Sequence, residues 1–399
     1  MGGPAAGTVG NRRARARTAG AGIYLHVPFC WRRCHYCDFN TYADRDALIP
    51  DYVVALHADV DAVADAGPAA LAPPHADVDV CWPTFDSLFI GGGTPTLVPA
   101  ADLAGVVRHV VDRFPLAEDA EVTVEANPET VDVVELRALA GAGVNRVSIG
   151  AQSFVPHVLD ALGRWHELEA PLRAVDACRW AGIDNVSLDL IYGTPGESSK
   201  DWEHSVRTAL DTGIGHLSAY ALTVEPSTEY ARRVRLGIAA APDDDVQAER
   251  MEQVDAWAAD AGLARYELSN WAWPGKESVH NRLYWRGGDW LGIGAGAHGH
   301  WQGRRWWTVR TPERYVRAAL DGGSPVAGFE VTDDGQRRAE RLMMGLRLTE
   351  GVGRAAVAPL DDRMVADLVA AGLLRDDPER LVLTSDGMRL ASSVTLQLL

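Results

Sequence analysis

The feature that most constrains the fold is a repeated alternation of short apolar runs and helical patterns, from Gly22 to about Thr223. Each run is rich in β-branched or aromatic residues and ends in a polar or glycine-rich turn. Strands separated by helices pair in parallel through right-handed crossovers, so six such units predict either a barrel-like wrap or a doubly wound sheet. The predicted strands are Ile23–Val27, Phe85–Ile90, Glu121–Glu125, Arg146–Ile149, Val186–Ile191 and His216–Ala221.

The helical patterns between these strands end where helices commonly end, at glycine. Gly141, Gly182 and Gly213 each follow a predicted helix, and glycine adopts the left-handed conformation of a helix C-terminus without steric cost. The predicted helices are Leu48–Ala64, Ala101–Asp112, Val131–Ala140, Val155–Leu162, Leu168–Ala181 and Asp201–Asp211.

The pattern changes after about Arg235. A helix predicted over Asp244–Ala261 leads to a segment dense in Trp, Gly and His, from Trp271 to Trp307, which has the composition of a loop. So many aromatic rings are unfavourable in water, so we expect this segment to cover something. From about Val331 a helix pair followed by a short hairpin predicts a mixed α+β, winged-helix-like domain. The expected parts are a disordered basic tail (1–20), the strand–helix domain (21–235), an aromatic-rich extension that completes the site (236–330) and a C-terminal domain (331–399).

Composition and charge exclude several classes of protein. Asp and Glu number 55 against 38 Lys and Arg, giving a net charge of -17, which argues against nucleic acid as the partner. No apolar run reaches the roughly 18 residues of a membrane-spanning helix. Five cysteines in 399 residues are too few for a disulfide-stapled secreted domain, so we expect a cytoplasmic protein whose thiols stay reduced.

The strongest chemical signal is the triplet Cys30-Trp-Arg-Arg-Cys34-His-Tyr-Cys37, just after the first strand. Three thiolates at this spacing favour a soft metal centre, either an iron–sulfur cluster or zinc. A cubane cluster held by three cysteines leaves one iron open for chemistry. The alternative is a structural zinc loop completed by His26 or His35.

Further polar motifs fall at the carboxyl ends of predicted strands, where parallel α/β barrels build their sites. Gly91-Gly-Gly-Thr-Pro-Thr96 follows the second strand, and its glycines would let the backbone approach a ligand closely. Glu125, Gln152 and Asp189 end or follow later strands, and Arg164 comes shortly afterwards. The alternatives are an ordinary glycine turn, a salt bridge for Asp189 and a surface cation for Arg164.

The triplet resembles the signature of the radical S-adenosylmethionine superfamily. The longer strings Tyr24-Leu-His-Val-Pro-Phe-Cys30 and Cys37-Asp-Phe-Asn resemble its coproporphyrinogen-oxidase-like branch. The resemblance implies an α/β fold, an incomplete TIM-like (β/α)6 barrel, with a C-terminal domain typical of that branch. It also implies a 4Fe–4S cluster on Cys30, Cys34 and Cys37, whose open iron binds S-adenosylmethionine. In that superfamily an electron from the cluster cleaves the sulfonium to a 5′-deoxyadenosyl radical.

The resemblance also assigns S-adenosylmethionine contacts residue by residue. Thr223 matches a further contact position in surroundings that differ from the family's. The expected contacts are Tyr24, Tyr36, Gly92, Gly93, Thr94, Glu125, Gln152, Arg164 and Asp189.

Two functions compete within the branch, haem chaperone and oxygen-independent coproporphyrinogen III oxidase. The oxidases usually carry a further cysteine where this chain has Phe39, and a longer N-terminal arm. The string His280-Asn-Arg-Leu-Tyr-Trp285 resembles the haem-associated segment of the chaperones, and imidazole is a good ligand for haem iron. The alternative for His280 is a hydrogen-bonded histidine that orders the loop. His35 stands where related chaperones commonly carry proline.

The chaperone interpretation names the expected partners. Haem would be the cargo, and the acceptors would be haemoproteins, which in the family include respiratory-chain proteins. Transient contact with a membrane surface is therefore expected without a spanning segment, and a dimer stays open.

Overall fold

The structure is a computed structural model that describes residues 20–73 and 81–399. The expected basic tail therefore lies outside the described residues, apart from Gly20. The predicted six-strand core is confirmed, and its strands pair in parallel in chain order. These strands are β1 (Ala21–Val27), β2 (Phe85–Gly92), β3 (Leu116–Ala126), β4 (Arg146–Gln152), β5 (Asn185–Tyr192) and β6 (His216–Ala221).

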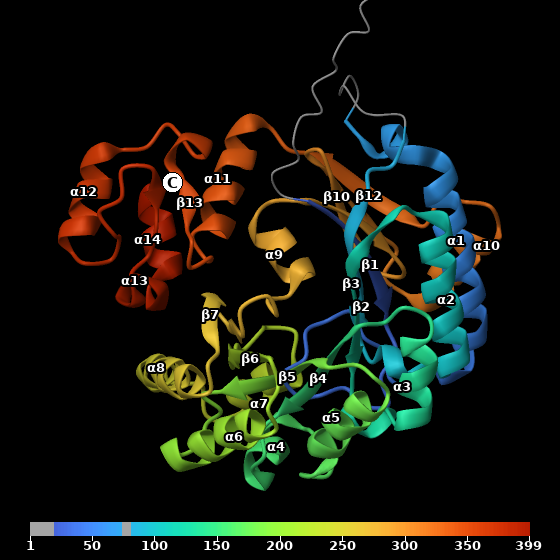
Figure 1. Cartoon of the computed structure of the whole chain (residues 1–399), viewed down its shortest axis with the longest axis horizontal. Helices are drawn as coiled ribbons and strands as arrows, with labels where there is room; N and C mark the ends of the chain where they lie inside the picture. Colours follow the sequence, from blue (N-terminus) through green and yellow to red (C-terminus); the bar gives the residue numbers. More distant parts are fainter. Residues whose placement is uncertain (1–19, 74–80) are drawn as a thin grey trace, which may run out of the picture.

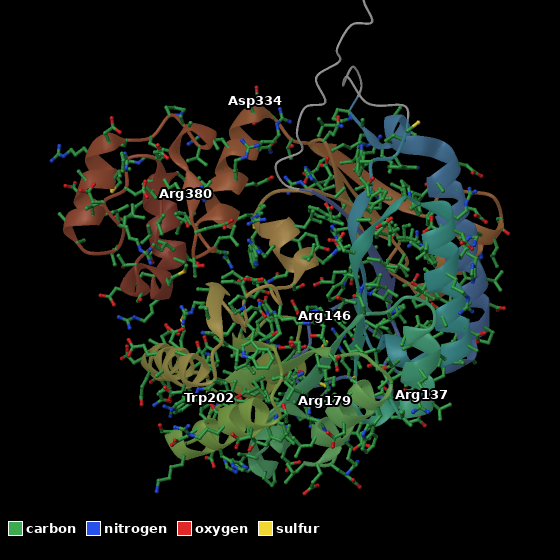
Figure 2. The ribbon with its side chains drawn as sticks, viewed as in Figure 1. Arg137, Arg146, Arg179, Trp202, Asp334 and Arg380 are labelled. Carbon is green, nitrogen blue, oxygen red and sulfur yellow. The ribbon has the colours of Figure 1, made fainter. Side chains whose placement is uncertain are left out.

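Helices cover the outside of this curved sheet (Figure 1). Two of them begin with a reciprocal capping box, Asp132 with Glu135 and Ser198 with Asp201, and Gly163 ends another at φ 70°. In Figure 2, Arg146 lies inside the barrel, whereas helical residues such as Arg137 lie outside it. The helices are α1 (Ile49–Leu71), α2 (Ala100–Arg113), α3 (Val133–Ala140), α4 (Pro156–Leu162), α5 (Ala170–Trp180) and α6 (Ser199–Asp211).

The segment expected to be loop-like is largely regular structure, so that prediction was wrong. It contains a short helix and strands that extend the sheet beyond β1, with β9 parallel to β1. Trp290, Leu291 and Ile293 lie in this added parallel strand, and aromatic and β-branched residues suit a pleated sheet. The elements of this segment and of the chain that directly follows it are α9 (Val279–Trp285), β9 (Asp289–Ile293), β10 (His298–Trp301), β11 (Arg304–Thr308), α10 (Pro312–Leu320) and β12 (Val326–Val331).

The other edge of the sheet is completed by an antiparallel pair beside β6. Among the described residues the strand order is β12-β11-β10-β9-β1-β2-β3-β4-β5-β6-β8-β7, so the sheet does not close on itself. The barrel is therefore incomplete, as expected, but it is wider than six strands. The remaining elements of this part are α7 (Glu229–Arg235), α8 (Asp244–Asp260), β7 (Ala264–Glu267) and β8 (Asn270–Ala272).

The C-terminal part is mixed α and β, as predicted. An antiparallel bridge between Leu374 and Leu383 follows the helix pair, where the hairpin was expected. In addition, the two short strands β13 and β14 pair across α12. Leu342, Leu368 and Val394 form the buried centre of this part, and α11 packs beside α9 (Figure 1). The elements are α11 (Asp334–Gly345), β13 (Val352–Gly353), α12 (Asp362–Ala370), β14 (Arg380–Leu381), α13 (Ser385–Arg389) and α14 (Ala391–Leu398).

Candidate functional site

The three cysteines of the triplet lie in one loop after β1 and line a single cavity of about 370 Å³ at the carboxyl end of the parallel strands. The loop closes on itself because the Cys30 N–H donates to Tyr42 O at 3.0 Å and the Tyr42 N–H donates to Pro28 O at 2.7 Å. All three thiols are partly exposed. The loop therefore presents three soft ligands to one space.

Each sulfur has a polar neighbour. Oγ1 of Thr94 lies 3.7 Å from Cys30 Sγ, Nη1 of Arg164 lies 3.7 Å from Cys34 Sγ, and Oγ1 of Thr41 lies 3.9 Å from Cys37 Sγ.

Burial nevertheless raises the pKa of Cys30 to about 11 and also raises that of Cys37. Because a thiolate is the metal-binding form, a bound metal centre would supply the positive charge that stabilises these partly buried sulfurs as thiolates. The donor set therefore fits a thiolate-bound cluster.

The described residues do not gather the four ligands that the zinc alternative requires. His26 is hydrogen-bonded at both ring nitrogens, to Tyr24 Oη at 2.8 Å and to Asn40 O at 2.9 Å. His35 Nδ1 lies 3.1 Å from Ala161 O. Within residues 20–73 and 81–399, no three His, Cys, Asp or Glu side chains converge on a position for one metal ion. Three thiols spread around a cavity suit a larger, multi-iron group better than a single zinc ion.

His35 fixes the cysteine loop to α4. The backbone N–H of His35 donates to Leu162 O at 3.0 Å, and a Cβ on Gly163 would lie 2.7 Å from the His35 ring. The imidazole thus packs on the end of the helix that precedes Arg164, which lies against Cys34. This contact ties the position of the cysteine loop to that of a neighbouring cation.

The glycine segment packs closely against other parts of the protein, which leaves no room for a side chain at two of its positions. A Cβ on Gly92, whose φ is +116°, would lie 2.4 Å from the His26 ring, and one on Gly93 would lie 2.5 Å from Phe29 O. Both residues still line the cavity. The Gly92 N–H donates to Glu125 Oε2 at 2.9 Å, so the tight turn also positions a carboxylate.

Two carboxylates face the cavity from the barrel strands. Burial raises the pKa of Glu125 to about 7, against the opposing hydrogen bond from Gly92. Asp189 accepts hydrogen bonds from Ser148 at 2.9 Å and from Ser187 at 3.0 Å, and burial raises its pKa as well. Such groups, held in a cavity and shifted by burial, are candidates for ligand binding.

The cavity brings together nearly all of the residues predicted as the site. Among the predicted cluster ligands and S-adenosylmethionine contacts, Tyr24 is the exception, because it lines the two adjacent cavities and donates toward His26 instead. The pair Trp31 and Trp165, whose rings lie 5.5 Å apart beside the cavity, was not predicted from the sequence. Each immediately follows a predicted site residue, which was the available signal. The predicted residues that line the cavity are Cys30, Cys34, Tyr36, Cys37, Gly92, Gly93, Thr94, Glu125, Gln152, Arg164, Asp189 and Thr223.

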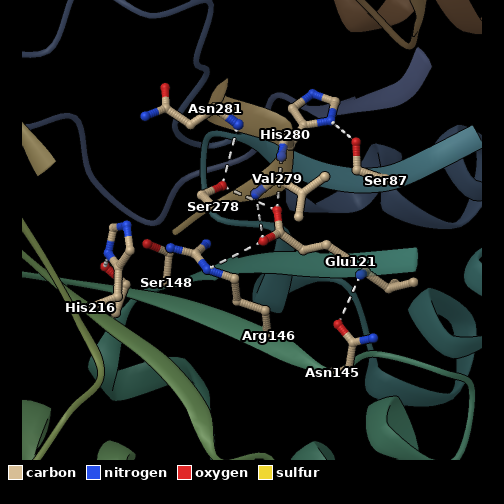
Figure 3. Close-up of polar contacts among 12 residues, drawn as sticks. Ser87, Glu121, Asn145, Arg146, Ser148, His216, Ser278, Val279, His280 and Asn281 are labelled. Atoms are coloured by element: carbon tan, nitrogen blue, oxygen red, sulfur yellow. Dashed lines mark hydrogen bonds and ion pairs between the residues drawn. The ribbon is translucent and has the colours of Figure 1, made fainter. Parts of the chain in front are cut away.

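The start of α9 forms a separate polar network deeper in the barrel (Figure 3). The carboxylate of Glu121 accepts hydrogen bonds from the N–H groups of Val279 and His280 and from Ser278 Oγ, at 2.9 to 3.1 Å. Arg146 Nε lies 3.9 Å from the same carboxylate. This network anchors the aromatic-rich extension inside the barrel.

His280 belongs to this network and not to an accessible haem surface. Its Nδ1 lies 2.8 Å from Ser87 Oγ, its Nε2 lies 2.8 Å from Tyr284 Oη, and only 1% of the residue is exposed. Burial lowers the pKa of His280 to about 3. The haem contact expected of His280 is therefore not supported by the structure, which matches the alternative of a hydrogen-bonded histidine that orders its segment.

Among the described residues, no helix is both long and apolar enough to cross a membrane. The family model for the radical SAM superfamily matches residues 24–209, and that for the HemN C-terminal domain matches residues 333–390.

The heme chaperone HemW of Mycobacterium tuberculosis is 44% identical over 384 residues, covering 95% of this chain and 94% of that protein. The heme chaperone HemW of Bacillus subtilis is 33% identical over 382 residues, covering 93% and 97%. In fold, the chain is similar to coproporphyrinogen III oxidase (HemN) from Escherichia coli, a radical SAM enzyme. That likeness has a TM-score of 0.79 at 19% identity and covers 96% of this chain and 91% of the other.

Proposed function

The chain belongs to the HemW family of the radical SAM superfamily, and we propose that it binds haem and delivers it to acceptor haemoproteins. The observation that carries this proposal is identity of 44% to a heme chaperone over 95% of the chain. The identity thus spans the barrel, the aromatic-rich extension and the C-terminal part alike. A likeness confined to the cysteine loop would have supported only the superfamily.

The cluster cavity would hold the two cofactors that the family implies. Cys30, Cys34 and Cys37 would bind a 4Fe–4S cluster, which supplies one electron at a time when bound. The cation of Arg164 beside Cys34 offsets the negative charge of the sulfurs. S-adenosylmethionine would lie against Glu125 and the other predicted contacts in the same cavity.

Coproporphyrinogen oxidation is the second candidate, because the chain shares its overall fold with HemN. The residue two positions after the last cysteine of the triplet argues against it. Phe39 stands there, 62% exposed, where the oxidases usually carry a cysteine.

One experiment separates the two functions. The full chain is reconstituted anaerobically with iron and sulfide, and is then given haem or coproporphyrinogen, each with S-adenosylmethionine and a reductant. We expect haem to be retained through gel filtration and no carbon dioxide to be released from coproporphyrinogen. Decarboxylation without haem retention would establish the oxidase, and zinc in place of iron and sulfide would overturn the cluster assignment.

Delivery is tested with an acceptor. Haem-loaded protein should transfer its haem to an apo-haemoprotein faster than haem dissociates into a passive scavenger such as albumin. We expect the acceptors to meet this protein in the cytoplasm or transiently at a membrane surface. The five free thiols suit such a reducing compartment.

A further inference from the structure

A second cavity, of about 570 Å³, adjoins the cluster cavity. Of the cofactor contacts proposed above, only Tyr24, Gly92 and Glu125 line it. Residues of β1, of α9 and of the added strands β9 to β11 line it. Aromatic rings of Tyr284, Trp290 and Trp307 line it. Its size is within the range of about 300–1,000 Å³ that small-molecule sites occupy, and its wall suits a flat apolar ring.

His298, at the start of β10, lines this cavity and differs from His280 in exposure and in the hydrogen bonding of its ring. It is exposed, and no described residue hydrogen-bonds to its ring nitrogens. Its ring lies 6.2 Å from that of Trp307, with 31° between the planes.

A cation stands at the edge of the same cavity. Arg310 is exposed, and its Nε donates to Asn40 Oδ1 at 3.3 Å. That bond orients the guanidinium while its terminal N–H groups have no described acceptor. A guanidinium held in this way can pair with carboxylates.

We propose that haem binds in this second cavity, with His298 as an axial ligand of the iron and Arg310 beside the propionates. This inference rests on the proposed function and moves iron ligation from the predicted His280 to another histidine. The second cavity and the cluster cavity share Phe39, Gly92 and Glu125. Haem bound there would therefore lie next to the S-adenosylmethionine site.

Haem titration of the reconstituted full chain tests the assignment, followed by absorption and electron paramagnetic resonance of the ferric complex. His298→Ala should weaken haem binding at least about tenfold and change the spin state, because an axial ligand is lost. Added imidazole should restore the original spectrum. The matched control is His204→Ala, since His204 is an exposed histidine on α6, far from the proposed ligands in sequence; affinity and spectrum should not change.

Two further variants sharpen the test. Arg310→Ala should weaken haem binding several-fold, with a larger effect at low salt, and Arg310→Lys should recover part of the loss. His280→Ala should lower the unfolding temperature but leave the ligand signature of bound haem in place.

The outcomes distinguish this inference from the function beneath it. Wild-type protein that fails to retain haem would overturn the proposed function itself. Wild-type protein that retains haem, with a His298→Ala variant of unchanged affinity and spectrum, would overturn only the ligand assignment. Loss of the ligand signature in folded His280→Ala would return the assignment to His280.

Discussion

The mouth and the interior of the barrel carry the same kinds of polar side chain but use them differently. Glu121 and Glu125 lie four residues apart on β3 and therefore face the same side of the sheet. Glu121 is saturated by three donors from the start of α9. Glu125 accepts a hydrogen bond from Gly92 and otherwise faces cavities. A buried carboxylate is thus structural when neighbouring donors fill its hydrogen-bonding capacity, and it is available to a ligand when they do not.

Removing a cysteine at the mouth should have the largest effect on ligand content and little effect on the fold. In Cys34→Ala, iron and sulfide after anaerobic reconstitution should fall to background, because a cluster bound by three cysteines does not survive on two. The unfolding temperature of the cluster-free chain should hardly move. Cys81→Ala, which removes an exposed cysteine, is the control and should keep its full iron content; equal iron in both variants would contradict the comparison.

Removing the interior carboxylate should have the largest effect on stability. Glu121→Ala leaves Arg146 and three donors without their shared acceptor, so we expect a loss of about 3–5 kcal/mol of unfolding free energy. Denaturant unfolding measures it. The matched control is Glu118→Ala, an exposed glutamate on the same strand, expected to change stability by less than about 0.5 kcal/mol. Similar losses in the two variants would show that the network anchors nothing.

The carboxylate at the mouth should make stability depend on pH. The pKa of Glu125 rises from 4.5 to about 7 on folding, so the folded state holds the proton more tightly. Its stabilising contribution is therefore complete below pH 4.5 and is lost as the pH rises toward 7. In the cluster-free chain, Glu125→Gln should remove up to about 3 kcal/mol of this change in unfolding free energy with pH.

Of the nearby charges, Asp189 raises and Arg146 lowers the pKa of Glu125. The measurement is denaturant unfolding between pH 4.5 and 8, with Glu118→Gln as the control. An unchanged slope in Glu125→Gln would contradict the assignment.

The smallest effect concerns the glycine turn that positions Glu125. Gly92 and Gly143 both have positive φ, at +116° and +108°, but a Cβ would meet the His26 ring only at Gly92 and nothing within 4 Å at Gly143. Replacing each with alanine should cost about 1 kcal/mol for the backbone alone. Gly92→Ala should lose about 1–2 kcal/mol more because of the clash. Equal losses, measured by denaturant unfolding, would show that His26 moves freely.

The sequence was sufficient for features that depend on local pattern. Six strands followed from apolar runs, and their parallel order then brought polar residues such as Asp189 and Glu125 to one end. The sequence was not sufficient where distant segments meet. The sequence of β9 resembles a loop, and its strand character comes from pairing with β1, where Asp289 lies opposite Ala21. The role of His280 depends on a hydrogen bond with Ser87, 193 residues away.

The two cavities are joined by Gly92 and Glu125, which line both. If ligands in the two cavities influence each other, the coupling is reciprocal. The factor by which S-adenosylmethionine changes the affinity for haem must equal the factor by which haem changes the affinity for S-adenosylmethionine. A change in the affinity for S-adenosylmethionine would therefore report whether haem is bound, without a direct measurement of haem.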